Sequence, residues 1–131
     1  MHDNPSTDPG MRQALTTAFS DLVVSPDKRS IKAAFLLPAD SPVFAGHFPG
    51  MPVIPAVYQV ALCAEAVTRT GSYTLAGISR SRFSKMCVPA IKYDLKISLA
   101  KKGAEVEATC TIHDAEDSEL CSKIVLIFVK S

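Results

Sequence analysis

A proline-rich stretch from Phe44 to Pro55 holds an imidazole, that of His47, in surroundings suited to proton transfer. The stretch reads Phe-Ala-Gly-His-Phe-Pro-Gly-Met-Pro-Val-Ile-Pro. Prolines restrict the backbone, whereas glycines allow a sharp path and a close approach by another group. Because proline suits the first position of a helix, Pro55 marks the expected helix start. We therefore expect a rigid loop that fixes His47 just before a helix N-terminus.

This arrangement favours acid–base chemistry beside a carbonyl group. A histidine has an unperturbed pKa of about 6.5 and is a natural general base near neutral pH. The first N–H groups of a helix have no intrahelical partners and carry partial positive charge, so they polarise a carbonyl oxygen or hold an oxyanion. The alternative is a histidine that only makes hydrogen bonds inside a tight loop, which is the usual role of a lone histidine.

The elements that must position this loop follow from periodicity. A helix is expected from Pro55 to about Thr70, with Gly71 as its stop. It is apolar on nearly all sides, which is typical of a buried helix. Alternation of apolar and polar residues indicates half-buried antiparallel strands. The expected strands are 19–24, 31–37, 74–85, 91–100, 104–113 and 119–129.

These elements predict an α+β fold in which one long antiparallel sheet wraps around one buried helix. Residues 1–18 are expected to form an N-terminal arm with a short helix near Met11 to Leu15, and residues 19–131 a single domain. The length of 131 residues and the 47% hydrophobic content suit one domain with a real core.

Composition also excludes several functional classes. The balance of 14 basic and 13 acidic residues gives no excess positive charge for nucleic acid. The longest stretch without charged residues, Ser41 to Ala64, contains four prolines and therefore predicts no membrane span. The N-terminus lacks the features of a secretory signal, so a cytoplasmic protein is expected.

The cysteines and the remaining histidines offer no second site. No Cys-x-x-Cys pair occurs and no histidine stands at metal-ligand spacing, so we expect no metal site. His113 ends a strand-like run and is expected at the surface. Reduced, buried thiols are expected at Cys63, Cys87, Cys110 and Cys121.

Two motifs give the chain a family resemblance. The run Gly-His-Phe-Pro-Gly-x-Pro-Val-x-Pro at 46–55 resembles the signature of the beta-hydroxyacyl-acyl carrier protein dehydratases, the FabA/FabZ-type family of the hotdog fold. Residues 82–89 resemble that family's Arg-Phe-x-Lys-x-x-Val-Pro strand and turn. The resemblance covers residues 19–129 and implies a dimer formed by joining two sheets. It also implies action on 3-hydroxyacyl thioesters in fatty acid or polyketide-type synthesis.

The resemblance implies a role for each matching residue. In that family the histidine takes a proton from C2 of the substrate, and a backbone N–H at the helix start polarises the thioester carbonyl. These roles fall on His47 and on the N–H of Ala56, which replaces the usual glycine. The implied substrate contacts are Gly46, Phe48, Pro49, Gly50, Pro55, Ala56, Gln59 and Phe83. No cofactor is implied beyond the phosphopantetheine arm of an acyl carrier protein or of coenzyme A.

The sequence departs from the family at the acid that protonates the departing hydroxyl. The other protomer supplies this carboxylate from its helix, and its position is Ala61 here. Glu65, one turn further on the same face, is the only acidic residue of the expected helix. Burial would raise its pKa toward a proton-donating role. The alternative is that Glu65 reaches solvent or pairs with Arg69.

Arg80, Arg82 and Lys85 form a basic cluster beside the implied tunnel mouth. Because acyl carrier proteins are acidic, this cluster is a candidate docking site, with a merely solvated face as the alternative.

Four functions therefore stay open. The first is a dehydratase with His47 as base and Glu65 as acid. The second is a catalytically incomplete subunit that forms a heterodimer, in place of a homodimer, with an active hotdog relative. The third is an acyl thioesterase in which Glu65 activates water, and the fourth is a non-enzymatic acyl-binding module.

Overall fold

The computed structural model describes residues 13–14, 17–41 and 53–131. Residues 13–14 and 17–18 are helical, where the arm was expected to carry a short helix, whereas Met11 and Leu15 lie outside the described residues. The elements that follow in chain order are β1 (Phe19–Val24), β2 (Ser30–Phe35), α2 (Ala56–Thr68), β3 (Tyr73–Phe83), β4 (Tyr93–Lys102), β5 (Glu105–Asp114) and β6 (Leu120–Lys130).

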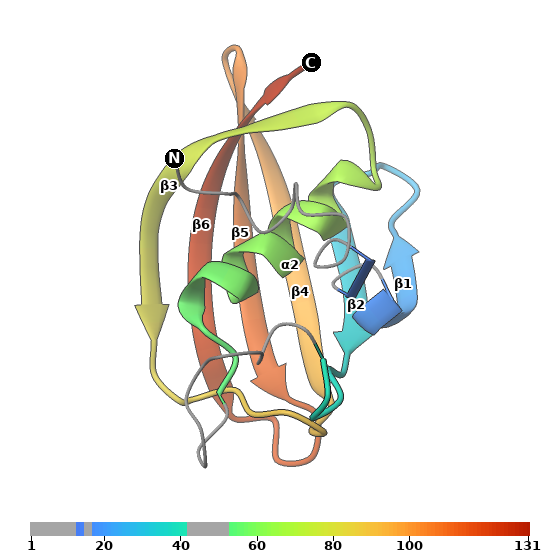
Figure 1. Ribbon diagram of the computed structural model, residues 1–131. Coiled ribbons are helices and arrows are strands. Elements are labelled where there is room, and N and C mark those ends of the chain that lie inside the picture. The colour runs from blue at the N-terminus through green and yellow to red at the C-terminus, as the bar shows by residue number, and fades with distance from the viewer. Residues whose placement is uncertain (1–12, 15–16, 42–52) are drawn as a thin grey trace.

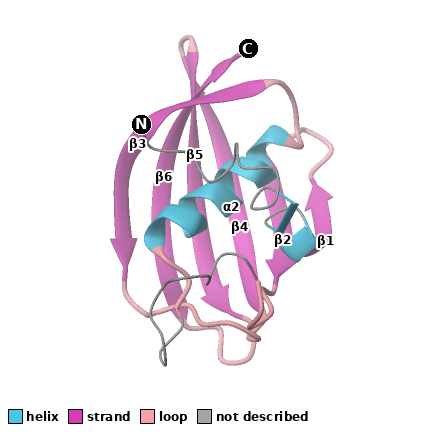
Figure 2. Cartoon of the chain, in the orientation of Figure 1, coloured by secondary structure: helices cyan, strands magenta, loops and turns pink. Residues whose placement is uncertain are grey.

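The six strands form one antiparallel sheet in the order β1-β2-β4-β5-β6-β3, with α2 lying across one of its faces (Figure 1). Figure 2 shows α2 in cyan against the magenta strands of the sheet. The predicted sheet around a buried helix is thereby confirmed. No helix in the described part of the chain is long and apolar enough to cross a bilayer.

Strand alternation places the core between the sheet and the helix. Ile97 pairs with Cys110, and Leu95 pairs with Ile112, so their side chains share one face of the sheet. All four are buried, as are Leu62, Ala66 and Val67 of α2. Burial of apolar area on this scale contributes about 25 cal/mol per Å² and is the main force holding α2 against the strands.

The helix ends earlier than the sequence predicts. It stops at Thr68, with Arg69 as its C-cap, and Gly71 lies beyond it in a bend. Two threonine hydroxyls explain the early end: Thr68 donates to the Glu65 carbonyl at 2.8 Å, and Thr70 donates to the Val67 carbonyl at 2.7 Å. Because these bonds satisfy carbonyls of the last turn, no glycine cap is required.

The third expected strand also ends early, at Phe83 in place of residue 85. The reason is that the Ser84 and Lys85 N–H groups both turn to the Cys121 carbonyl, at 2.8 and 3.1 Å. The strand β1 has the predicted bounds, and the remaining strand ends shift by one or two residues from the predicted positions.

The surface position expected for His113 is wrong. This residue lies in β5 and is half-buried, and its Nδ1 is buried without a hydrogen-bond partner in the described structure. The cysteines agree with the prediction: Cys63, Cys87, Cys110 and Cys121 are free and fully buried.

Candidate functional site

A cavity of about 430 Å³ lies at the N-terminal end of α2, and we refer to it as the helix-start cavity. Four residues that the sequence assigns to substrate binding line it together, although they come from α2, from the residue before it and from the end of β3. The cavity residues in this group are Pro55, Ala56, Gln59 and Phe83. The rest of the lining is Val53, Ile54, Ser84, Lys85 and Met86.

The predicted site residues around His47 cannot be placed against this cavity. Gly46, His47, Phe48, Pro49 and Gly50 lie outside the described residues. The described chain resumes at Val53, which is part of the cavity wall. The assignment of His47 as general base therefore stays a prediction from the sequence.

The first residue of α2, Ala56, lines the helix-start cavity, so the N-terminus of this helix lies at the cavity. Pro55 is the N-cap, with an extended backbone at φ −60° and ψ 153°. Its carbonyl accepts the N–H groups of Tyr58 at 3.0 Å and Gln59 at 3.1 Å. The N–H of Ala56 precedes these bonds and has no intrahelical acceptor. Since the first turn carries no acidic residue, the partial positive charge of this helix end is not offset there.

The side chain of Gln59 is buried, and hydrogen bonds to other parts of the chain hold both ends of its amide. Only 4% of the residue is exposed. Its Nε2 donates to the Ile54 carbonyl at 3.0 Å, and its Oε1 accepts the Ser122 hydroxyl at 2.5 Å. The amide therefore ties the start of α2 to β6, a structural role that the sequence does not reveal.

The two helix positions considered for the acid lie away from the cavity of their own chain. Ala61 is 5% exposed and belongs to the core, and neither Ala61 nor Glu65 is among the cavity residues. Glu65 lies nine residues after Ala56, or about 14 Å along the helix axis. Its Oε2 accepts the Thr68 hydroxyl at 3.3 Å.

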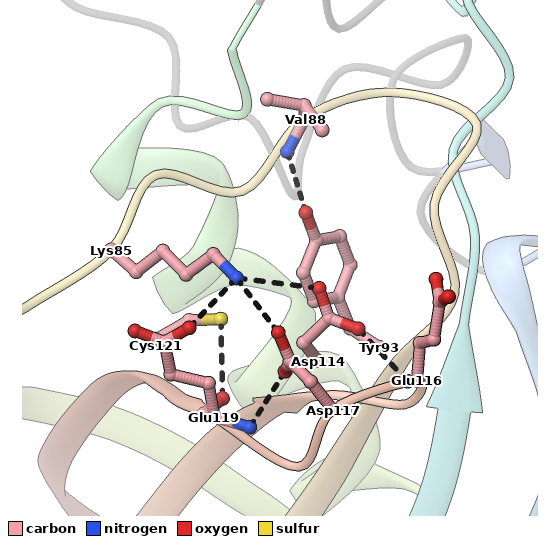
Figure 3. A network of polar contacts seen from close by, with 8 residues as sticks. All are labelled: Lys85, Val88, Tyr93, Asp114, Glu116, Asp117, Glu119 and Cys121. Carbon is pink, nitrogen blue, oxygen red and sulfur yellow. Dashed lines mark hydrogen bonds and ion pairs between the residues drawn. The ribbon is translucent and has the colours of Figure 1, made fainter.

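The basic cluster expected for docking is divided in the structure. Arg80 and Arg82 are exposed on β3. Lys85 instead points its ammonium at three carboxylates of the turn between β5 and β6, as Figure 3 shows. Hydrogen bonding to Glu119, and then to Asp117, holds the pKa of Lys85 well above its ordinary range. The sequence identifies this acidic segment only as a turn, because nothing local relates it to Lys85.

Known proteins are similar to this chain in sequence. The sequence matches the model of a family described as ApeI-like, ApeI dehydratase, over residues 23–123. It is 36% identical over 72 residues to the 3-hydroxyacyl-[acyl-carrier-protein] dehydratase FabZ of Pelotomaculum thermopropionicum, which covers 48% of this chain and 51% of that protein. The chain thus spans about half the length of the curated relatives it matches.

Solved structures share the fold at low identity. The dehydratase heterocomplex ApeI:P from Xenorhabdus doucetiae is similar at a TM-score of 0.71 and 17% identity, over 86% of this chain and 96% of that one. A putative thioesterase from Lactococcus lactis is similar at a TM-score of 0.66 and 18% identity, over 92% and 95%. These likenesses show that the chain has the hotdog fold.

Proposed function

Because the chain belongs to the ApeI-like dehydratase family, we propose that it dehydrates 3-hydroxyacyl thioesters carried on an acyl carrier protein or on coenzyme A. The observation that carries this proposal is the helix-start cavity, where Ala56, whose N–H has no acceptor within its own helix, lies among mostly apolar residues. Such a cavity suits a thioester carbonyl with an acyl chain attached.

The reaction needs a base, a carbonyl donor and an acid. His47 takes the proton from C2, and the N–H of Ala56 stabilises the negative charge that develops on the thioester oxygen. As the C2–C3 double bond forms, the C3–O bond breaks and the hydroxyl leaves as water after it takes a proton from an acid. We assign that acid to Glu65 of a second protomer.

The proposed dimer places two chains edge to edge along β3. This strand ends the sheet order, so one of its edges has no neighbouring strand among the described residues. It exposes Leu75, Ile78 and Phe83, which are apolar side chains that a partner would cover. Arg80 and Arg82 on the same strand are the groups proposed to meet an acidic carrier.

A second candidate is a subunit that lacks its own acid and works in a heterodimer. Two points favour it: the position that the sequence resemblance assigns to the acid holds Ala61, which is buried, and a similar solved structure is a dehydratase heterocomplex. In this case a related hotdog chain supplies the carboxylate, while this chain supplies His47 and the N–H of Ala56.

The purified chain is tested with 3-hydroxyacyl thioesters of a carrier protein and of coenzyme A, and products are identified by mass spectrometry. We expect a 2-enoyl thioester, and we expect His47→Ala to lower the rate by about 10²-fold or more. Glu65→Gln should also abolish activity, whereas Glu105→Gln, a change at an exposed carboxylate, should not.

The remaining outcomes separate the alternatives. A fully active Glu65→Gln variant removes Glu65 from the mechanism. A chain that is inactive alone but active when produced with a related hotdog chain supports the heterodimer. Release of free thiol in place of a 2-enoyl product identifies a thioesterase, and binding without turnover identifies an acyl-binding module.

A further inference from the structure

We propose that Lys85 is a positioning residue that fixes the wall of the helix-start cavity and the start of α2, rather than a docking residue for the carrier. The kinetic test of this inference rests on the proposed function, whereas a test by hydrogen exchange does not depend on activity.

The anchor is the ammonium of Lys85 among three carboxylates. Its Nζ lies 3.1 Å from Glu119 Oε2, 3.4 Å from Asp117 Oδ2 and 3.6 Å from Asp114 Oδ2. Isolated surface ion pairs contribute little, but here several charges share one geometry and the Asp114 side chain is only 14% exposed. We therefore expect these ion pairs to hold the Lys85 side chain in one position against the segment between β5 and β6.

The carboxylates are themselves held in place by backbone donors (Figure 3). Asp114 Oδ1 accepts the N–H of Glu116 at 2.8 Å, and Asp117 Oδ1 accepts the N–H of Glu119 at 2.8 Å. The Asp114 N–H donates to the Glu119 carbonyl at 2.9 Å, which closes the turn between β5 and β6. The turn therefore presents a prearranged acceptor site to Lys85.

A short backbone segment and one hydrogen bond connect this anchor to the helix start. Residues 84–90, which we call the strap, run from the end of β3 past the cavity. The Cys87 carbonyl accepts the N–H of Ile54 at 2.8 Å, and Ile54 immediately precedes the N-cap Pro55. Further along the strap, the Val88 N–H donates to the buried Tyr93 hydroxyl at 2.9 Å. We therefore expect a displacement of Lys85 to move the Cys87 carbonyl and the Ile54 N–H bonded to it. Through Pro55, this displacement would shift the N–H of Ala56.

The local charge argues against carrier docking at Lys85. One ammonium and three carboxylates have a formal sum of −2, so an acidic partner would be repelled at this position. Arg80 and Arg82 lie on β3, before the strap, and Arg82 is paired in register with Lys123 of β6, so positive charge gathers there instead.

The kinetic test compares two 3-hydroxyacyl thioesters as substrates. In one the acyl group is attached to the acyl carrier protein, and in the other it is attached to pantetheine alone. Lys85→Met keeps the apolar stem that lines the cavity and removes the charge. We expect kcat to fall about tenfold or more on both substrates by the same factor, with KM little changed, since small displacements of reacting groups are costly. Lys85→Arg should restore most of the rate.

The matched control is Lys102→Met. Lys102 makes an ion pair of the same kind, with Glu107 at 3.3 Å, on a side chain that is 61% exposed and is not part of the cavity. This variant should match the wild type on both substrates. A Lys85→Met effect confined to the carrier-bound substrate and expressed in KM would show docking and overturn the proposal.

Hydrogen exchange tests the same inference without turnover. In Lys85→Met, the amide of Ile54 should exchange about tenfold faster than in the wild type, with no change in Lys102→Met. If Lys85→Met does not fold, Glu119→Gln weakens the shortest of the three ion pairs and should show the same effect at lower amplitude. An unchanged exchange rate at the Ile54 amide in a folded variant contradicts the proposal. A wild-type protein without dehydratase activity would contradict only the proposed function.

Discussion

Gln59 is the residue at which the candidate site and the core meet. One end of its amide holds the Ile54 carbonyl, and the other holds the Ser122 hydroxyl of β6, so a single side chain couples the helix start to the sheet. Ser122 is itself fully buried. A buried polar group that loses its partner bears the full cost of desolvation, which is larger than the net value of the hydrogen bond.

Replacing Gln59 with Ala should lower the free energy of unfolding by about 2–4 kcal/mol, because it leaves two buried groups without partners and removes buried volume. Urea denaturation followed by circular dichroism measures this change. The control is Gln13→Ala, at an exposed position, which should stay within about 0.5 kcal/mol of the wild type. A cost at Gln59 as small as at Gln13 would contradict the role of this amide as a link.

Among the elements, β3 combines a structural and a candidate functional role. It contributes Phe83 to the helix-start cavity and leads directly into the strap. It is also an edge strand, and an unpaired edge that exposes apolar side chains favours pairing with another chain. This exposed edge supports the dimer that we propose from the family resemblance.

Ile78→Lys tests that dimer, since Ile78 is 53% exposed near the middle of β3. A charge buried at the proposed interface should raise the dissociation constant at least tenfold, as measured by analytical ultracentrifugation. Val23→Lys is the matched control, because Val23 is 62% exposed on β1, at the opposite edge of the sheet. Equal weakening by both variants, or a wild type that stays monomeric at every concentration, would count against pairing through β3.

At the scale of the whole molecule, the four cysteines lie in one hydrophobic core, so their reactivity measures whether that core stays closed. They come from α2, the strap, β5 and β6, and all are fully buried. Burial raises the pKa of the Cys87 thiol to about 12, so its reactive thiolate is scarce near neutral pH. The neighbouring Cys110 side chain, and then burial, raise the pKa of the Cys63 thiol well above its ordinary value.

We therefore expect none of the four thiols to react promptly with a thiol reagent in the native protein, and all four to react after denaturation in guanidinium chloride. Spectrophotometric thiol titration gives both counts. Rapid reaction of one cysteine under native conditions would reveal local opening at its element, and mass spectrometry of the labelled peptide would identify which one.

Much of the fold was predictable because its signals are local. The alternation along β4 and β5 predicts two half-buried strands, and the uninterrupted apolar run after Pro55 predicts the buried helix. Errors occurred where a neighbour distant in sequence or a hydroxyl decided the outcome. Thr68 and Thr70 ended the helix before Gly71, and Cys121 ended β3 at Phe83.

The sequence by itself determined the hotdog elements and their order along the chain, because periodicity and proline positions are local signals that lie in neighbouring residues. Only the tertiary structure decided the sheet order, the link from Gln59 to Ser122 and the capture of Lys85 by the turn after β5. These contacts join residues 63 and 34 positions apart. They depend on strand order and register across the sheet, which no local pattern encodes.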